Sequence, residues 1–219
     1  MALPLPQHDQ LSAAVVGNAF VDRVYAKLSP VYDLIFGAPL QAGRVAAVAR
    51  MNLQPGDRVL EVGVGTGLNT SLYPRDCSIT AIDLSAPMLE KARARAERDR
   101  LSHVRLMEMD AANMTFADDT FDVVYAPYLV SVVADPIAVV REMYRVCRPG
   151  GRLVILNHFR SPNPILSRVE RAISPLTIHV GFKADVDLPG FLAQANLRPV
   201  SIDKVNVPRI WSLVTCIKN

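Results

Sequence analysis

Residues 58–69 read Arg-Val-Leu-Glu-Val-Gly-Val-Gly-Thr-Gly-Leu-Asn and place glycines at alternate positions, Gly63, Gly65 and Gly67. The apolar run before these glycines predicts a buried strand, and the glycines predict a turn at its end. Because glycine has no Cβ, it adopts positive φ angles and lets a ligand lie against the main chain. Leu68 stands where the dinucleotide fingerprint G-x-G-x-x-G has its third glycine, which weakens a pyrophosphate-binding interpretation.

The sequence around this stretch alternates apolar runs with amphipathic segments. The further strands are expected at residues 79–83, 103–109, 121–126, 153–156, 200–207 and 211–217, with helices at 85–100, 136–146 and 187–196 and a turn at 148–151. This alternation predicts an α/β fold with a doubly wound, mostly parallel sheet. Ligands of such sheets bind beyond the carboxyl ends of the strands.

Carboxylates follow two of these strands. Asp83 ends one strand, 16 residues after Gly67, and Asp110 follows the next. An acid at the end of the second strand suits the hydroxyls of a ribose. Between them, Ser85 is expected to cap the helix 85–100, whose arginines are interleaved with acids and are expected to face water.

The run from Glu61 to Gly67 resembles the E/D-x-G-x-G-x-G signature of class I S-adenosylmethionine (SAM) methyltransferases. The resemblance implies a seven-stranded Rossmann-like fold, SAM as cofactor, S-adenosylhomocysteine (SAH) as product and no metal. It places Glu61 near the cofactor's ammonium through water, Asp83 at the ribose and Asp110 at the adenine. The expected cofactor-binding residues are Tyr32, Glu61, Gly63, Gly65, Thr66, Gly67, Asn69, Asp83, Leu84, Met88, Asp110, Ala111, Ala112 and Pro127.

Composition narrows the class of protein. Of 219 residues, 50% are hydrophobic and 21% are charged, which is typical of a globular chain long enough for one domain with additions. The net charge of +3 neither requires nor excludes an anionic partner, and no nucleic-acid or protein partner is indicated. Cys77, Cys147 and Cys216 lack C-x-x-C spacing, which argues against a disulfide framework or a zinc site. A reducing, cytoplasmic setting is therefore expected. No transmembrane helix is expected, because the run free of charges from Val123 to Ala134 has only 12 residues.

The segment before the sheet is predicted to be helical. Residues 10–28 show an amphipathic pattern that fits a helix packed on the domain as well as one lying on a membrane. A second helix is expected over residues 31–51, interrupted near Gly37. We therefore expect a helical cap or membrane-contact segment at 1–52 and the SAM-binding domain at 53–219, with an insert at about 160–186.

Three stretches indicate the methyl acceptor: residues 25–37 (Tyr-Ala-Lys-Leu-Ser-Pro-Val-Tyr-Asp-Leu-Ile-Phe-Gly), 126–133 (Ala-Pro-Tyr-Leu-Val-Ser-Val-Val) and 156–159 (Leu-Asn-His-Phe). They resemble the one-domain bacterial phosphatidylethanolamine N-methyltransferases. The resemblance implies methylation of phosphatidylethanolamine and its mono- and dimethyl derivatives towards phosphatidylcholine, at the inner face of the cell membrane. Quinone C-methyltransferases share a paired-tyrosine segment and remain the alternative enzyme. A SAM- and lipid-binding module without catalysis is a third interpretation.

Candidate acceptor residues follow from this chemistry. Tyr25, Tyr32 and Tyr128 offer aromatic faces to a methylated ammonium, although they would also suit a core. His158 is a candidate base or phosphate contact, and a histidine satisfied by the backbone is the competing interpretation. The expected contacts to a lipid phosphate or an anionic membrane surface are His158, Arg160, Arg168, Arg171 and Lys183. A solvated loop would have a similar composition.

Overall fold

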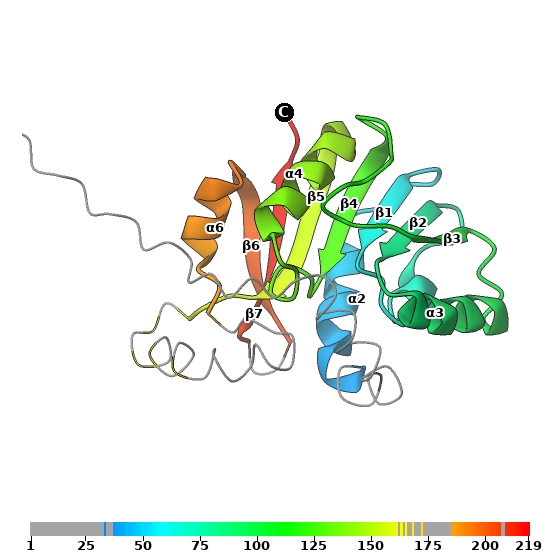
Figure 1. Ribbon diagram of the computed structural model, residues 1–219, viewed down its shortest axis with the longest axis horizontal. Coiled ribbons are helices and arrows are strands. Elements are labelled where there is room, and N and C mark those ends of the chain that lie inside the picture. The colour runs from blue at the N-terminus through cyan, green and yellow to red at the C-terminus, as the bar shows by residue number, and fades with distance from the viewer. Residues whose placement is uncertain are drawn as a thin grey trace, which may run out of the picture.

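The computed structural model describes residue 33, residues 37–161, residues 163, 165, 168 and 172, and the ranges 185–206 and 209–219. In this part of the chain seven strands form one sheet in the order β3-β2-β1-β4-β5-β7-β6 (Figure 1). The strands are β1 Arg58–Val62, β2 Ser78–Asp83, β3 Val104–Glu108, β4 Phe121–Pro127, β5 Cys147–His158, β6 Pro199–Val205 and β7 Trp211–Ile217. The expected amphipathic helix at 10–28 lies outside the described residues.

The strand directions confirm the predicted sheet. β1 pairs in parallel with β2 and β4, β2 with β3, and β4 with β5, whereas β7 runs antiparallel between β5 and β6. The strand order changes direction between β1 and β4, because β2 and β3 lie on one side of β1 whereas β4 and β5 lie on the other. Crevices for ligands form at such a reversal, beyond the carboxyl ends of the strands.

Helices cover both faces of the sheet (Figure 1). The described helices are η1 Ala38–Leu40, α2 Gln41–Arg50, η2 Thr70–Leu72, α3 Ala86–Arg98, α4 Pro136–Val146 and α6 Leu188–Gln194. α2 packs beside Val59, Val123 and Leu156, whereas α4 and α6 pack with side chains of the opposite face such as Leu60 and Val124. Because both faces are covered, β4 is a continuous buried run rather than an alternating one.

β5 is longer than the expected strand 153–156, and the predicted turn at 148–151 is part of it. The ladder continues because the Gly150 N–H donates to the Lys218 carbonyl at 2.7 Å and the Lys218 N–H donates to the Gly151 carbonyl at 2.9 Å. Gly150 has a φ of 70°, which a side chain would disfavour. The end of the chain therefore extends the sheet at this point.

The expected cap of α3 is also different. Ser85 precedes the helix, but its side chain forms no capping hydrogen bond. Its backbone N–H instead donates to Asp83 Oδ1 at 2.9 Å, so the acid at the end of β2 also orders the start of α3. None of the helices among the described residues is long and apolar enough to cross a bilayer.

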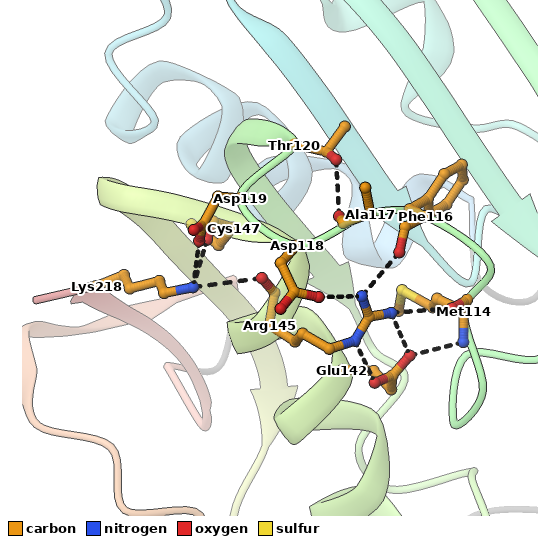
Figure 2. A network of polar contacts seen from close by, with 10 residues as sticks. All are labelled: Met114, Phe116, Ala117, Asp118, Asp119, Thr120, Glu142, Arg145, Cys147 and Lys218. Carbon is orange, nitrogen blue, oxygen red and sulfur yellow. Dashed lines mark hydrogen bonds and ion pairs between the residues drawn. The ribbon is translucent and has the colours of Figure 1, made fainter.

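A network of polar contacts lies at the amino ends of β4 and β5 (Figure 2). Arg145 bonds to Glu142, Asp118 and the carbonyls of Met114 and Phe116. Lys218 reaches Asp119 at 2.7 Å and the carbonyls of Arg145 and Cys147. These side chains tie the β3–β4 loop and the last residues of the chain to α4, at the end of the sheet away from the glycine loop.

Candidate active site

A cavity with about 1020 Å³ of empty space, counting its opening to solvent, lies beyond the carboxyl ends of β1, β2 and β4. Ten residues predicted for the cofactor or acceptor line it: Gly63, Gly65, Asp83, Leu84, Met88, Asp110, Ala111, Ala112, Pro127 and Tyr128. Apolar side chains from the segment after β4, including Leu129, Val132 and Val133, complete its wall. The sheet thus brings residues far apart in the sequence to one rim.

The glycine loop presents main chain to this cavity. Gly63, Gly65 and Gly67 have φ angles of 79°, 55° and 80°. A Cβ added to Gly65 would meet no protein atom within 4 Å and would project into open space, whereas one added to Gly67 would lie 3.1 Å from Ala92 Cβ. Gly65 therefore leaves room for a ligand, and Gly67 allows the loop to pack against α3.

Asp83 holds the loop as well as lining the cavity. Its Oδ2 accepts the Gly65 N–H at 2.7 Å while Oδ1 accepts the Ser85 N–H. Asp110 has a similar local role one strand further on, because its Oδ1 accepts the Ala112 N–H at 2.9 Å. Both carboxylates are thus oriented by backbone donors at the rim of the sheet.

A second, smaller cavity lies between α2 and the glycine loop, with about 270 Å³ of empty space counting its opening. It is lined by Arg44, Gly63, Val64, Gly65, Thr66, Leu68, Asn69, Pro127 and Tyr128. Four of these, Gly63, Gly65, Pro127 and Tyr128, also line the larger cavity, so the two hollows adjoin.

Arg44 was not predicted as a site residue. It is only 3% exposed, donates to the Gly37 carbonyl at 3.2 Å, and places its guanidinium carbon 5.1 Å from the centroid of the Tyr128 ring. The sequence carries one signal for it. Leu40, Gly43, Ala47 and Met51 form a buried stripe of α2 and its flanks, and Arg44 is a charge beside that stripe.

Glu61 is fully buried and lines neither cavity. Its Oε1 accepts from Asn69 Nδ2 and its Oε2 from the Tyr73 hydroxyl, each at 2.6 Å. Burial raises the pKa of Glu61 to about 7, against the lowering effect of these two hydrogen bonds and of the nearby Arg44 charge. A contribution of Glu61 at the cofactor would therefore run through Asn69, which does line the second cavity.

Thr66, in the glycine loop, is held by Asp33, which precedes the sheet, and by Arg95 of α3. Its hydroxyl donates to Asp33 Oδ1 at 2.5 Å, and its carbonyl accepts from Arg95 Nε at 3.0 Å. Arg95 also forms an ion pair with Asp33. The prediction that the arginines of this helix face water is wrong for Arg95, because its guanidinium fastens the glycine loop to the segment before the sheet.

Tyr128 follows β4 in a left-handed conformation, with a φ of 56°. Its hydroxyl donates to the Leu40 carbonyl and accepts from Asn206 Nδ2, both at 3.0 Å. Burial raises its pKa. Asn206 in turn accepts the Gly43 N–H, and a Cβ on Gly43 would approach the Tyr128 hydroxyl to 2.7 Å. Tyr128 therefore joins the rim to α2, and its hydroxyl is engaged by protein groups.

The other acceptor candidates are distributed differently. His158 is the last residue of β5, 8% exposed, with its ring 6.3 Å from that of Trp211, and it lines neither cavity. Arg160 is paired with Asp187 at 2.6 Å, and Arg168 is exposed. Tyr25, Tyr32, Arg171 and Lys183 lie outside the described residues. Their roles stay predictions.

Comparison with known proteins decides the family. A family model described as "Methyltransferase domain" matches residues 60–155. The chain is 42% identical over 181 residues to the phosphatidylethanolamine N-methyltransferase of Cereibacter sphaeroides, covering 82% of this chain and 88% of that enzyme. The protein belongs to the class I SAM-dependent methyltransferases.

Two further similarities place this methyltransferase among its relatives. It is 35% identical over 169 residues to the ubiquinone/menaquinone biosynthesis C-methyltransferase UbiE of Ruegeria sp. (strain TM1040), covering 75% of this chain and 66% of that enzyme. Its fold is shared with a crystal structure of the geranyl diphosphate C-methyltransferase from Streptomyces coelicolor A3(2) in complex with Mg²⁺, geranyl-S-thiolodiphosphate and SAH. That match has a TM-score of 0.66 at 16% identity and covers 81% of this chain and 76% of that one.

The residues at the rim of this methyltransferase fit a SAM molecule. Ser85 Oγ and Asn69 Oδ1 are buried atoms without a hydrogen-bond partner among the described residues, and they belong to residues that line the larger and the smaller cavity, respectively. Gly65 leaves open space where a side chain would stand. Bound there, SAM would supply a methyl group already activated on a sulfonium. Within the described residues, no three His, Cys, Asp or Glu side chains are grouped to hold a metal ion.

Proposed function

We propose that this methyltransferase transfers methyl groups from SAM to the amine of phosphatidylethanolamine and then to its mono- and dimethyl derivatives, towards phosphatidylcholine. One observation carries the proposal. The similarity to the phosphatidylethanolamine N-methyltransferase of Cereibacter sphaeroides reaches 42% identity and spans 88% of that enzyme, whereas the similarity to UbiE of Ruegeria reaches 35% and spans 66%. The acceptor-related stretches of the sequence support the same assignment.

The chemistry requires little acid–base catalysis. The nitrogen lone pair forms the new C–N bond as the C–S bond of SAM breaks, and SAH leaves as a neutral thioether. Each attacking amine must first lose a proton to solvent or to a nearby group. An aliphatic ammonium has a pKa near that of lysine, about 10, and desolvation lowers it, so a weak base or a water relay suffices. The protein's main task is alignment of the nitrogen with the methyl group.

Tyr128 is the described acceptor candidate that lines both cavities. Because its hydroxyl is held by Leu40 and Asn206, we propose that it acts through its ring and not as a base. The Arg44 guanidinium carbon already lies 5.1 Å from the centroid of this ring, and this contact with a cation supports the proposal. Tyr25 and Tyr32 are proposed to add further aromatic faces, and His158 a phosphate contact or base.

We further propose that the enzyme works as a peripheral membrane protein at the inner face of the cell membrane. The basic side chains predicted for contact with an anionic surface support this, since each contributes about 1 kcal/mol near such a surface. Deleting residues 1–24 should reduce co-sedimentation with vesicles that contain phosphatidylglycerol. Undiminished sedimentation would move the contact to the basic insert, which an Arg168→Gln variant then tests, with the exposed Arg93→Gln as its control.

The substrate assignment has a direct test. The purified protein is incubated with methyl-labelled SAM and either phosphatidylethanolamine vesicles or a demethylated quinol in mixed micelles. We expect label in mono-, di- and trimethylated lipid and none in the quinol. Label on the quinol alone would replace the proposal with the quinone C-methyltransferase function, and vesicle binding without any transfer would favour a non-catalytic module.

A further inference from the structure

We propose that Asn206 is a positioning residue for methyl transfer, because its side-chain amide sets the place of the Tyr128 ring at the junction of the two cavities. The inference rests on the proposed role of that ring at the acceptor amine. It goes further by giving the residue that follows β6 a part in the reaction. Asn206 lies outside residues 60–155, which match the Methyltransferase domain family.

The Asn206 side chain connects the end of β6 to α2 and to the rim. It is 6% exposed, and its Nδ2 donates to the Tyr128 hydroxyl at 3.0 Å while its Oδ1 accepts the Gly43 N–H of α2. Because Gly43 is a donor, the amide oxygen must face it, and Nδ2 then faces the hydroxyl. The Tyr128 hydroxyl donates in turn to the Leu40 carbonyl at 3.0 Å. The bonds therefore run in one direction, from Gly43 to Leu40, and favour a single orientation of the hydroxyl.

Gly43 leaves the space that this arrangement needs. It is the third residue of α2, and N–H groups in the first turn of a helix commonly need acceptors from outside the helix. Asn206 Oδ1 supplies that acceptor. A Cβ added to Gly43 would lie 2.6 Å from Asn206 Oδ1 and 2.7 Å from the Tyr128 hydroxyl oxygen. A side chain at position 43 would therefore push the amide and the hydroxyl away from the helix.

The segment that follows β4 has a second buried anchor, which differs from the first. The Ser131 N–H and hydroxyl donate to Asn157 Oδ1 at 3.4 and 3.2 Å, and Asn157 Nδ2 donates to the His158 carbonyl at 2.6 Å. Ser131 lines neither described cavity, whereas Tyr128 lines both. Asn157 thus holds the path of the main chain, and Asn206 bonds directly to a side chain at the junction of the cavities.

The position of the Tyr128 ring depends on its hydroxyl. The main chain is fixed at this point, since the Tyr128 N–H donates to the Leu156 carbonyl at 2.5 Å. The ring extends from there towards α2, where Leu40 and Asn206 hold its far end. A displacement of a catalytic group by about 1 Å can reduce a rate about a hundredfold. Asn206 lines neither described cavity, so it would act on the reaction through Tyr128.

The first test observes the ring and needs no methyl acceptor. The protein is labelled with carbon-13 at the hydroxyl-bearing carbon of tyrosine, and the NMR signal of Tyr128 is the one absent from Tyr128→Phe. Asn206→Gly should change the chemical shift of this signal, because it removes the amide while glycine retains the φ of 60° at that position. Asn196→Gly, at an exposed asparagine with a φ of 51°, should leave it unchanged. An unchanged Tyr128 signal in Asn206→Gly would overturn the proposal.

The second test measures the reaction. Asn206→Gly should lower kcat for phosphatidylethanolamine about tenfold to a hundredfold, with a change of about twofold or less in SAH affinity. Rates are divided by the concentration of SAH-binding sites from calorimetry, so unfolded protein does not affect kcat. A loss of SAH affinity as large as the loss of kcat would make Asn206 a structural residue of the donor site and overturn the proposal.

A double-mutant cycle shows whether Asn206 acts through the Tyr128 hydroxyl. Tyr128→Phe keeps the ring and removes the hydroxyl, so it should lower kcat by a factor similar to that of Asn206→Gly. The double variant should lose no more than either single variant. Losses that multiply in the double variant would show that the two residues act independently, and would also overturn the proposal.

Gly43→Ala displaces the same groups without removing either of them. It should change the Tyr128 signal and lower kcat as Asn206→Gly does, whereas Val45→Ala, exposed on the same helix, should do neither. A changed signal with the kcat of the wild type would show that the position of the ring does not limit the reaction. If the protein methylates a quinol and not phosphatidylethanolamine, kcat is measured on the quinol and the NMR test stands. The two proposals therefore fail separately.

Discussion

The two ends of the central sheet use polar groups in opposite ways. At the amino ends of β4 and β5, Arg145 and Lys218 reach carboxylates and main-chain carbonyls in a dense network (Figure 2). At the carboxyl ends, burial raises the pKa of Glu61, and Asn69 and Ser85 each have a buried oxygen without a hydrogen-bond partner in the described part of the chain. The first arrangement stabilises the fold, and the second leaves polar groups to be satisfied by a ligand.

The backbone shows the same contrast. Gly63, Gly65 and Gly67 and the non-glycine residue Tyr128 have positive φ angles at the carboxyl rim. Glycine adopts such angles without strain, whereas a tyrosine in this conformation persists only where its surroundings determine it, and here Leu40 and Asn206 hold the Tyr128 hydroxyl. Positive φ angles also occur near the other end, at Asp119 in a turn and at Gly150 within β5, and neither residue lines a described cavity. The two ends therefore differ in whether the backbone with positive φ angles borders a cavity.

Glu61 provides the largest expected effect. Its pKa is about 7 in the folded protein against 4.5 for a free side chain, so the folded state binds more protons between these values. Stability should fall as the pH rises through this window, by on the order of 3 kcal/mol in total. Urea unfolding at several pH values should show this decline in the wild type and not in Glu61→Gln. An equal decline in that variant would show that ionisation of Glu61 is not the cause of the decline.

A suitable control for that experiment is Glu108→Gln, since Glu108 is exposed on β3.

The contribution of Glu142 to stability has the opposite pH dependence. The Arg145 hydrogen bond lowers its pKa below the ordinary value of 4.5, so its contribution is lost only as the pH falls through a more acidic range. Glu61 and Glu142, at opposite ends of the sheet, should therefore change the stability of the protein in separate pH ranges.

Asp83→Ala should produce the next largest effect. Removing hydrogen bonds to a carboxylate typically costs about 1.5–3 kcal/mol, which corresponds to a decrease in SAH affinity of roughly tenfold to a hundredfold. The domain should remain folded, because Asp83 organises the Gly65 and Ser85 N–H groups at the rim and not the core. Calorimetry with SAH and circular dichroism measure the two properties. Unchanged SAH affinity, as expected for the exposed control Glu90→Ala, would contradict the assignment.

Arg145→Met should instead reduce the stability of the fold and leave SAH binding unchanged. The substitution leaves the Met114 and Phe116 carbonyls and two carboxylates without their partner, and we expect a loss of about 1–3 kcal/mol in the free energy of unfolding. SAH affinity should not change. Urea unfolding measures the loss, and the exposed Arg141→Met on the same helix serves as its control. A selective loss of SAH binding would show that the two ends are coupled.

Asp33→Asn should have the smallest effect. The Asp33 and Arg95 ion pair is partly exposed, so weakening it should reduce SAH affinity about twofold to fivefold through the Thr66 loop. The difference from wild type should shrink at high salt, because salt screens an exposed pair. An affinity difference that is independent of salt would point to the Thr66 hydrogen bond instead of the ion pair.

Local sequence signals were sufficient to predict the sheet and many of the residues that line the larger cavity. The glycine loop and the acids Asp83 and Asp110 follow apolar strands, and parallel strands bring their carboxyl ends together. The contacts of Arg44 and Arg95 could not be predicted in this way, although the position of Arg44 beside a buried stripe marks it as unusual. Each occupies a helix whose pattern places charged residues in water, and only the packing of α2 and α3 against the glycine loop brings these two side chains to it. The length of β5 also depends on a distant partner, Lys218.

The contact of Asp33 with Thr66 and Arg95 limits how this enzyme can be re-engineered. Asp33 lies in the stretch 25–37 that resembles phospholipid methyltransferases. Its carboxylate nevertheless accepts a hydrogen bond from Thr66, in the loop expected to bind the methyl donor, and pairs with Arg95. A chimaera that imports this stretch from a relative with another acceptor would therefore disturb donor affinity as well. Acceptor specificity and donor binding should be exchanged together, with positions 33, 66 and 95 transplanted as one set.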